Sequence, residues 1–418
     1  MASTSVKVAL RVRPLSPKEV LASAQECISF VAPGTPQVSI APTNSTSVAE
    51  SLGLTSVAPG GSGSAKSFTY DHVFDTLSTQ EEVYEGCCRP LVDRFLEGFN
   101  ATILAYGQTG SGKTHSMGTG LEAAAEPGNE GIVPRAIYYL FDKLQSQANA
   151  SPEGFKYEVF VSFLELYNEE IVDLLLPRAK DGSTAANSSA LSIREDGTGK
   201  IRWYGIKEQP VSSPEELLDV LEKGSLCRTT GSTDMNASSS RSHAIFSVIL
   251  KQQKWSTGPG QAVSTESLAV TPHEEADAVS GQEPANEVAD PTSHPGGSFQ
   301  TTSSKFHFVD LAGSERLKRT NAEGDRKKEG ISINQGLLAL GNVISALGDD
   351  ARRSANSHVP YRDSKLTRML QDSLGGNSQT LMLACVSPSD TNYAETLNTL
   401  NYANRARNIK NKVVINQE

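Results

Sequence analysis

The stretch at residues 101–115, ATILAYGQTGSGKTH, determines how the rest of the chain is interpreted. Its beginning, Ala101–Tyr106, is apolar and rich in strand-forming side chains, so it predicts a short buried strand. The following residues read GQTGSGKT and match the pattern G-x-x-x-x-G-K-[ST] at every fixed position. A strand that continues through such a loop into a helix is the setting in which this pattern binds the phosphates of a nucleotide.

The residue types of this loop explain that chemistry. Gly107, Gly110 and Gly112 allow backbone angles that a Cβ atom forbids, so successive N–H groups can face a phosphate. Lys113 is placed to reach the β- and γ-phosphates, and the Thr114 hydroxyl can ligate Mg²⁺. The positive end of the following helix adds to this anion site. The alternative, a glycine-rich turn that fits the pattern by chance, is disfavoured by the predicted strand and helix on either side.

The composition limits the class of protein. The chain of 418 residues is 37% hydrophobic and 21% charged, which suits a soluble globular protein with one large α/β domain or two smaller ones. It contains no apolar run long enough to predict a membrane span, and its N-terminus does not resemble a signal peptide. The five cysteines form no C-x-x-C pair, so we expect buried thiols in a reducing compartment rather than disulfides or zinc ligands.

The net charge of −10 is concentrated in one segment. Between Trp255 and Ser304 the chain has seven acidic residues and no lysine or arginine. Over residues 254–304 we therefore expect an acidic, disordered surface insertion, because its apolar content is too low to offset the entropy of ordering. The alternative is that these acids modulate contact with a basic partner or compete for a basic surface of the same chain. A local basic surface remains compatible with the overall charge.

Strand and helix patterns alternate along the chain. Apolar alternation predicts strands over residues 6–12, 68–74, 101–106, 157–167, 244–251, 305–311 and 380–386. Helical spacing predicts helices over residues 80–99, 132–144, 214–223, 331–347, 362–370 and 392–409, with a break at Pro90 and an end at Gly224. Residues 31–66 and 178–190 predict mobile polar loops. This alternation around one phosphate loop favours a single α/β domain.

Two further stretches carry polar groups suited to chemistry. Residues 236–243 read NASSSRSH, and residues 310–315 read DLAGSE. Each is weak alone, since a serine-rich turn or an acid followed by glycine is common. Asp310 ends an apolar run, which is the position of a carboxylate that supports Mg²⁺ in nucleotide-hydrolysing proteins.

Together with GQTGSGKT, and in this order, these stretches closely resemble the kinesin motor domain, and within it the chromokinesin-type group of N-terminal motors. The pieces RVRP at 11–14, HVPYRDSKLT at 358–367 and YANRARNIKN at 402–411 extend the resemblance over essentially the whole chain. It implies a single P-loop NTPase motor domain over residues 1–409, of the α/β class. The sheet would be mostly parallel or mixed, with about eight strands and helices on both faces. Residues 410–418 would begin a neck linker, which a short N-terminal strand would cover.

The resemblance also implies the roles of individual residues at the nucleotide site. Pro14 and His115 would flank the adenine of ATP or ADP, with Arg11 and Arg13 nearby. The phosphates would be wrapped by Gly107, Gln108, Thr109, Gly110, Ser111, Gly112, Lys113 and Thr114. Thr114 and Ser240 would hold Mg²⁺, with Asp310 reaching it through water. Asn236, Ser239 and the Gly313 N–H would face the γ-phosphate, and Arg241 with Glu315 would form an ion pair that closes the site.

A basic stretch follows this site. Residues 316–328 contain six basic residues against two acidic ones. In kinesins this region, the helix after it and the segment at 361–368 bind the acidic surface of tubulin. The implied microtubule contacts are Lys318, Arg319, Arg326, Lys327, Lys328, Tyr361, Arg362, Lys365 and Arg368. Such contacts steer association and weaken with salt.

The sequence thus predicts an ATP hydrolase, stimulated by microtubules, that moves toward the microtubule plus end. The alternative is a microtubule-binding regulator that hydrolyses ATP slowly and hardly moves. A GTPase-like switch is disfavoured because Asn411–Lys412 is not followed by the N-K-x-D aspartate. We expect a location on the cytoplasmic microtubule cytoskeleton, no membrane or nucleic-acid partner, a monomeric fragment, and dimerisation of a longer parent through a coiled coil beyond residue 418.

Overall fold

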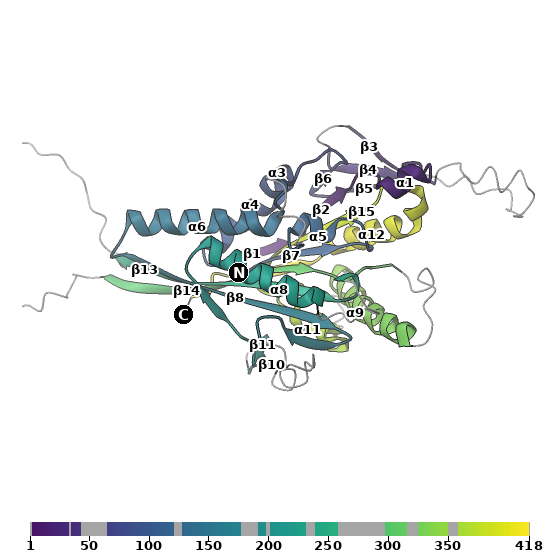
Figure 1. The fold of residues 1–418 in the computed structure, drawn as a ribbon. Coiled ribbons are helices and arrows are strands. Elements are labelled where there is room, and N and C mark those ends of the chain that lie inside the picture. Colours follow the sequence, from purple (N-terminus) through teal and green to yellow (C-terminus); the bar gives the residue numbers. More distant parts are fainter. Residues whose placement is uncertain are drawn as a thin grey trace, which may run out of the picture.

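The computed structural model describes residues 2–32, 35–42, 65–120, 128–176, 191–197, 201–230, 239–257, 297–315, 325–349 and 358–417. A nine-stranded sheet forms its centre (Figure 1). Its order is β12 (Gln209–Val211), β8 (Phe155–Tyr167), β13 (His243–Thr257), β14 (Gly297–Asp310), β7 (Ala101–Tyr106), β15 (Gln379–Val386), β2 (Lys7–Val12) and β6 (His72–Phe74), and β9 (Glu170–Asp173) pairs with β8.

The sheet is mixed. From β14 to β6 all neighbouring strands are parallel, whereas β8, β9, β12, β13 and β14 are joined antiparallel. A parallel pair needs a crossover connection. Helices α9 (Asp325–Gly348) and α11 (Lys365–Met369) lie in the connection from β14 to β15, whereas the connection from β2 to β6 carries the short α1 (Pro17–Leu21) and the strands β3 (Ile28–Phe30), β4 (Gln37–Ile40) and β5 (Lys66–Thr69). The expected α/β class and the mixed sheet of about eight strands are confirmed.

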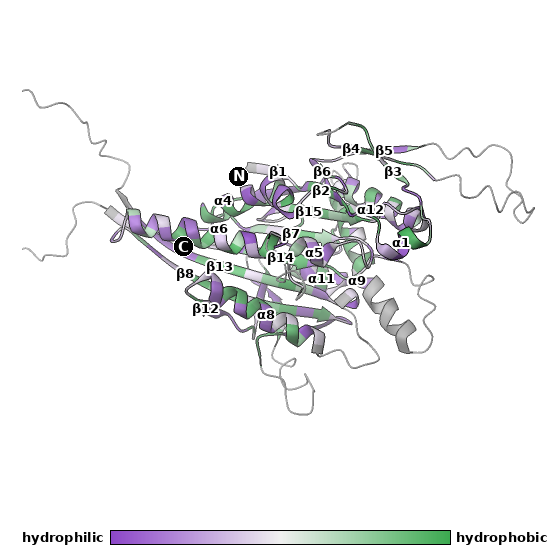
Figure 2. Ribbon diagram, turned by 45° about the horizontal axis from the view of Figure 1, so that its top comes forward, coloured by the Kyte–Doolittle hydropathy of each residue, from purple (hydrophilic) through white to green (hydrophobic). Residues whose placement is uncertain are grey.

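Alternating side chains of the central strands divide the core into two layers. On β7, Ala101, Ile103 and Ala105 pack into one apolar cluster, and Leu104 and Tyr106 pack into the other. The first cluster lies under α4 (Arg89–Leu96), α6 (Ile132–Ala150) and α8 (Pro214–Thr230). The second lies under α9 (Asp325–Gly348), α11 (Lys365–Met369) and α12 (Tyr393–Ala406). Figure 2 shows the hydrophobic colouring along these central strands.

The expected split of one helix near Pro90 is confirmed, whereas the expected end of another at Gly224 is wrong. The helix at 80–99 is divided into α3 (Gln80–Val83), a π-helical turn at Tyr84–Cys88 and α4, so the break falls just before Pro90. Gly224 does not end α8, which continues to Thr230. A Cβ atom at Gly224 would lie 2.2 Å from Phe163 Cδ1, so this glycine permits close packing of helix on sheet rather than a helix end.

The two loop boundaries were also wrong. Within 31–66, β4 (Gln37–Ile40) and the start of β5 (Lys66–Thr69) join β3 (Ile28–Phe30) in a three-stranded antiparallel sheet. Within 254–304, both ends are strand, because β13 and β14 pair as far as Thr257 and Gly297. Residues 43–64, 178–190 and 258–296 of the predicted loops lie outside the described residues.

The remaining helices and strands are short, and among them α5 (Lys113–Met117) packs on the central strands β7 and β14. A Ser16–Glu19 capping box starts α1 (Pro17–Leu21), and a glycine N-cap, Gly112, starts α5. β10 (Ser192–Glu195) and β11 (Ile201–Tyr204) form a hairpin, and β1 (Ala2–Ser5) pairs with β16 (Lys410–Val413). Short 3₁₀ turns lie at Ser239–Arg241, Tyr361–Asp363 and Asp390–Asn392.

The cysteines are all free thiols, as expected. Within the described parts of the chain, no helix is both long and apolar enough to cross a membrane.

Candidate functional site

The glycine-rich loop closes over the end of β7. Gly107, Gly110 and Gly112 have φ values of 153°, 74° and 97°, in the region that favours glycine. A Cβ atom on Gly107 would lie 2.1 Å from the carbonyl oxygen of Cys385 on the neighbouring strand. The motif therefore needs glycine here both for its turn and for its close approach to β15.

Lys113 lies inside this loop. Its ammonium donates to the carbonyl oxygens of Gly107 (2.9 Å) and Gln108 (3.0 Å). Burial lowers the pKa of Lys113, and the negative charge of Asp310 opposes that shift. The Lys113 ammonium is thus buried against the loop backbone. Because this positive charge is already desolvated, it would interact strongly with a bound anion.

Asp310 and Thr114 meet beside the loop. The Thr114 hydroxyl donates to Asp310 Oδ2 at 2.7 Å. Asp310 is only 3% exposed, and its other oxygen, Oδ1, accepts no hydrogen bond within the described residues. A buried carboxylate oxygen without a partner is costly, so this oxygen is suited to a ligand that brings a donor. Asp310 is at the strand end where the sequence predicted it.

Arg228, which the sequence analysis missed, compensates this buried carboxylate. Its side chain is 7% exposed, and Nη1 lies 3.6 Å from Asp310 Oδ2 while Nε lies 3.7 Å from Glu165 Oε1. The same guanidinium donates to the Ser242 carbonyl at 2.8 Å and to the Ser242 hydroxyl at 3.2 Å. Arg228 lies on the same helical face as Leu217, Leu221 and Gly224. An arginine on this otherwise apolar face was the sequence signal that could have identified it as a buried functional residue.

The loop after β14 lies directly on the glycine-rich loop. Glu315 accepts from the Thr109 N–H at 2.8 Å and from the Thr109 hydroxyl. The Ser314 N–H donates to the Gly107 carbonyl at 3.2 Å, and a Cβ atom on Gly313 would lie 2.3 Å from Thr109 Oγ1. A change on either loop is therefore transmitted to the other by direct contact.

The same loop is joined to the serine-rich turn. The Gly313 N–H donates to the Ser240 carbonyl at 2.8 Å, and the Ala312 N–H donates to His243 Nδ1 at 3.1 Å. Burial, followed by the charge of Arg228, lowers the pKa of His243 to about 3, so this imidazole stays neutral and can accept. His243 is a further functional position that the sequence analysis did not single out.

Two expected interactions take a different form. Where Arg241 and Glu315 were expected to pair, no ion pair joins them in the described residues, because Glu315 is bound to Thr109. The Gly313 N–H, expected to face a phosphate, is engaged by Ser240. Both expected interactions concern a nucleotide-bound site, and both remain predictions.

The N-terminal arginines contact the phosphate loop from the other side. Arg13 donates to the Gly110 carbonyl at 2.7 Å and forms a two-pronged ion pair with Glu19 at 2.7 and 2.8 Å. Hydrogen bonding from Arg13 lowers the pKa of Glu19 to about 2. Arg11 is buried and donates to Gln80 (2.6 Å) and Ser116 (2.9 Å) beneath α5. Pro14 and His115 are both exposed, next to these arginines.

Several predicted contacts lie where the structure gives no side-chain information. Asn236, Lys318 and Arg319 lie outside the described residues, and for Ser239 only the backbone is described. Arg326, Lys327 and Lys328 form the first turns of α9, again as backbone only. Their assigned roles remain predictions.

The segment at 361–368 divides into internal and surface residues. Tyr361 is half-buried, its hydroxyl donates to the Leu374 carbonyl at 2.5 Å, and burial raises its pKa; its expected microtubule contact remains a prediction. Arg362 is 73% exposed and pairs with Glu195 at 2.9 Å, and Lys365 is exposed. Arg368 donates to the Ile193 carbonyl at 2.9 Å. Arg362 and Arg368 thus connect this segment to the β10–β11 hairpin.

The C-terminal segment lies along the sheet. After β16 pairs with β1, the Asn416 N–H donates to the Gly98 carbonyl at 3.0 Å and its amide to Asn100 Oδ1 at 2.9 Å. Asn377 donates to Asn416 Oδ1 at 2.9 Å, and the Ser303 N–H donates to the Asn416 carbonyl at 3.0 Å. One asparagine therefore joins this segment to three separate parts of the core.

Together the glycine loop, Lys113, Thr114 and Asp310 define a nucleotide-binding protein of the P-loop class. The Glu315 loop contacts the phosphate loop, and the serine-rich turn contacts the Glu315 loop. The kinesin motor-domain family model matches residues 11–409. The chain belongs to the kinesin motor-domain family, whose members are microtubule-stimulated ATPases.

Named relatives support this assignment. The chain is 50% identical to human kinesin-like protein KIF21B, 48% identical to Caenorhabditis elegans kinesin-like protein klp-12 and 47% identical to human chromosome-associated kinesin KIF4A. These matches cover 99%, 100% and 98% of this chain but only 23%, 23% and 27% of the relatives. The chain thus spans about a quarter of their length, and the expected similarity to chromosome-associated kinesins is confirmed.

Solved structures show the same fold. A fast kinesin is similar with a TM-score of 0.74 and 34% identity, covering 99% of this chain and 94% of that one. A KIF14 dimer in its two-heads-bound state, with AMP-PNP and in complex with a microtubule, is similar with a TM-score of 0.76 and 33% identity. That match covers 99% of this chain and 97% of the KIF14 chain.

Proposed function

We propose that this chain hydrolyses ATP, with Mg²⁺, and couples hydrolysis to plus-end-directed movement along microtubules. The observation that carries the proposal is the contact of the Glu315 loop with Thr109 of the phosphate loop, because it joins a nucleotide-binding element to a segment that continues into α9. Phosphoryl transfer depends on positioning and charge stabilisation, which such a set of fixed backbone and side-chain groups supplies.

The described residues fit the nucleotide and its metal. Lys113 and the N–H groups of the glycine loop would stabilise the phosphates, and Thr114 and Ser240 would supply hydroxyl ligands for Mg²⁺. The partnerless Oδ1 of Asp310 would accept from a metal-bound water. When bound, Mg²⁺ neutralises phosphate charge.

Glu315 is proposed to act on the attacking water. A carboxylate is a weak base for water, so we propose that Glu315 orients the water through a second water molecule. Its hold on Thr109 would be exchanged for an ion pair with Arg241 when Asn236, Ser239 and the Gly313 N–H face a γ-phosphate. Loss of that phosphate would remove its contacts with both loops, as in other nucleotide switches.

The proposed microtubule surface combines the start of α9 with Arg362, Lys365 and Arg368. The exposed charges of Arg362 and Lys365 support it, and the remaining members are Lys318, Arg319, Arg326, Lys327 and Lys328. We propose movement toward the plus end because residues 410–418 would begin a neck linker. The support is the β1–β16 pairing and the four hydrogen bonds of Asn416 described above.

The test is steady-state ATP turnover of the chain with and without stabilised microtubules, beside Glu315→Ala and the isosteric Glu315→Gln. We expect stimulation of at least tenfold for the native chain and its loss in both variants, while the microtubule affinity of the variants is retained. Gliding of polarity-marked microtubules then tests direction.

Two outcomes would contradict the proposal. Tight binding with turnover near the basal rate would favour a slow microtubule-binding regulator. Turnover that Glu315→Gln leaves intact would show that the Glu315 carboxylate does not take part in hydrolysis.

A further inference from the structure

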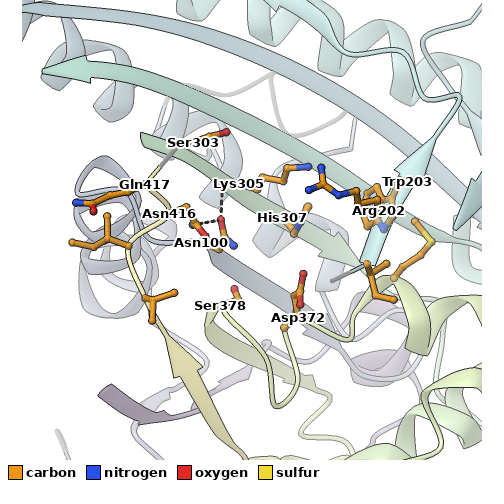
Figure 3. A pocket seen from close by; sticks show the side chains of 15 residues that line it. Asn100, Arg202, Trp203, Ser303, Lys305, His307, Asp372, Ser378, Asn416 and Gln417 are labelled. Atoms are coloured by element: carbon orange, nitrogen blue, oxygen red, sulfur yellow. Dashed lines mark hydrogen bonds between the residues drawn. The ribbon is translucent and has the colours of Figure 1, made fainter. Parts of the chain in front are cut away.

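A second cavity lies away from the phosphate loop. It has a volume of about 380 Å³ and lies between β14, the β10–β11 hairpin, the end of α11 and the C-terminal segment (Figure 3). None of its lining residues belongs to the glycine loop, the serine-rich turn or the Glu315 loop. Its size is in the range of cavities that hold small organic molecules.

Two basic side chains line one side of this cavity. Arg202 comes from β11 and Lys305 from β14, and Figure 3 shows their charged ends pointing toward each other, with Asp372 on the opposite wall. Arg202 Nε pairs with Asp196 at 3.0 Å. The Lys305 ammonium forms no hydrogen bond or ion pair with any residue that the structure describes. Two cations that face each other repel, and an anion between them would relieve that repulsion.

An aromatic platform adjoins these cations. The Trp203 ring lies 5.3 Å from the His307 ring at an angle of 30°. His307 shares a hydrogen bond of 2.8 Å with the Ser247 hydroxyl, and burial lowers its pKa to about 3, so it stays neutral. Trp203 thus lies against an uncharged ring that also lines the cavity, and its indole can contact a planar ligand.

We propose that this cavity binds a small aromatic anion, with its charged group between Arg202 and Lys305 and its ring against Trp203. Aryl phosphates, sulfonates and carboxylates share this chemistry. Hydroxyl and amide groups of Asn100, Ser303 and Ser378 line the rest of the wall and suit polar ring substituents. The proposal does not depend on the proposed motor activity.

Ligand binding in this cavity depends on the position of the C-terminal segment. Val414, Ile415, Asn416 and Gln417 line the cavity, so a bound ligand touches that segment only while it lies along the sheet. A ligand that binds only this arrangement stabilises it by mass action. Ligand occupancy and the position of residues 414–417 are therefore linked.

The protein has a built-in reporter. It contains two tryptophans, Trp203 and Trp255, and Trp255 packs on Phe299 near the end of the β13–β14 hairpin. Trp255→Phe leaves Trp203 as the sole fluorophore. Titration with 8-anilinonaphthalene-1-sulfonate should then show saturable energy transfer from Trp203. Phenyl phosphate should compete, inorganic phosphate should compete less well, and neutral phenol should not compete.

Matched variants separate this site from nonspecific dye binding. Arg202→Gln and Lys305→Gln should each weaken binding by about three- to tenfold, the usual effect of removing one charged donor at a partly exposed site. Lys143→Gln, on α6 outside the cavity, should leave it unchanged. Asn416→Ala should also weaken binding, because it loosens one wall. ATP turnover without microtubules checks that Lys305→Gln is folded.

Three results would overturn the proposal. They are transfer that does not saturate, equal competition by phenol and phenyl phosphate, and equal affinity in the native chain and Lys305→Gln. An affinity unaffected by Asn416→Ala would overturn the link to the C-terminal segment.

Discussion

Arg228→Met should be among the most destabilising single substitutions in the described part of this chain. The guanidinium lies within 3.7 Å of two carboxylates, Asp310 and Glu165, whose side chains are 3% and 13% exposed. Removing it leaves two nearly buried negative charges without this cation, a change that costs about 3–5 kcal/mol. The lost hydrogen bond to the Ser242 carbonyl adds about 1 kcal/mol. Since domains are stable by only about 5–15 kcal/mol, this is a large fraction of the total.

The assay is urea unfolding followed by circular dichroism at one fixed concentration of Mg-ADP, because bound nucleotide contributes to stability. The matched control is Arg89→Met, which removes an exposed ion pair with Glu85 and should change the urea midpoint little, because exposed ion pairs contribute little to stability. The triple variant Arg228→Met, Asp310→Asn, Glu165→Gln should recover at least half of the loss, because the uncompensated charges are gone.

Either of two results would refute this reasoning. If Arg228→Met costs less than about 1 kcal/mol, the guanidinium is not the main compensating charge for these carboxylates. If the triple variant is no more stable than Arg228→Met, the loss arises from packing or from Ser242 rather than from charge.

Three other substitutions test separate features. Burial lowers the pKa of His243 from 6.5 to about 3, so between these values the unfolded chain binds a proton that the native chain does not, and stability falls as the pH drops below 6.5. His243→Asn, whose amide oxygen can still accept from Ala312, should flatten the change in urea midpoint between pH 7 and pH 5; an unchanged slope would contradict this. Gly224→Ala should destabilise by about 1–3 kcal/mol in urea despite the better helix propensity of alanine, because its Cβ would meet Phe163 at 2.2 Å; a gain in stability would show that the ring moves aside. Asn416→Ala should speed hydrogen exchange of the Ser303 amide by about five- to 100-fold, because the C-terminal segment loses about 1–3 kcal/mol of hydrogen bonding. Equal exchange rates in the native chain and the variant would mean that backbone hydrogen bonds alone hold the C-terminal segment on the sheet.

Most of the sheet could be predicted because its strands carry local patterns. Alternating or continuous apolar runs located β2, β7, β8, β13, β14 and β15 to within a few residues, apart from the outer ends of β13 and β14. Those ends, residues 252–257 and 297–304, are mostly polar and pair through their backbones, and their single aromatic residues, Trp255 and Phe299, set no hydrophobic period. The same is true of β4, whose short strand is stabilised by tertiary pairing with β3 and β5.

The glycine-rich loop and Asp310 could be predicted because their chemistry requires particular residue types at fixed spacing. Arg228 could not be placed, because what matters is its distance from Asp310, and the two residues are on different elements. The partners of Glu315 depend on the conformation of two loops, which no spacing encodes. The same limit applies to Tyr361, whose ring is turned inward by a single hydrogen bond to Leu374.

The long β13–β14 hairpin has a practical consequence for attaching other proteins to this one. Asp310, at the nucleotide end of β14, is thirteen residues from Gly297, so the two ends of the strand are about 40 Å apart. At the far end, Thr257 and Gly297 are directly paired, and their Cα atoms are about 5 Å apart. A guest domain with adjacent termini, such as a fluorescent reporter, could be joined at these two residues without straining either strand. It would then be carried about 40 Å from the phosphate loop.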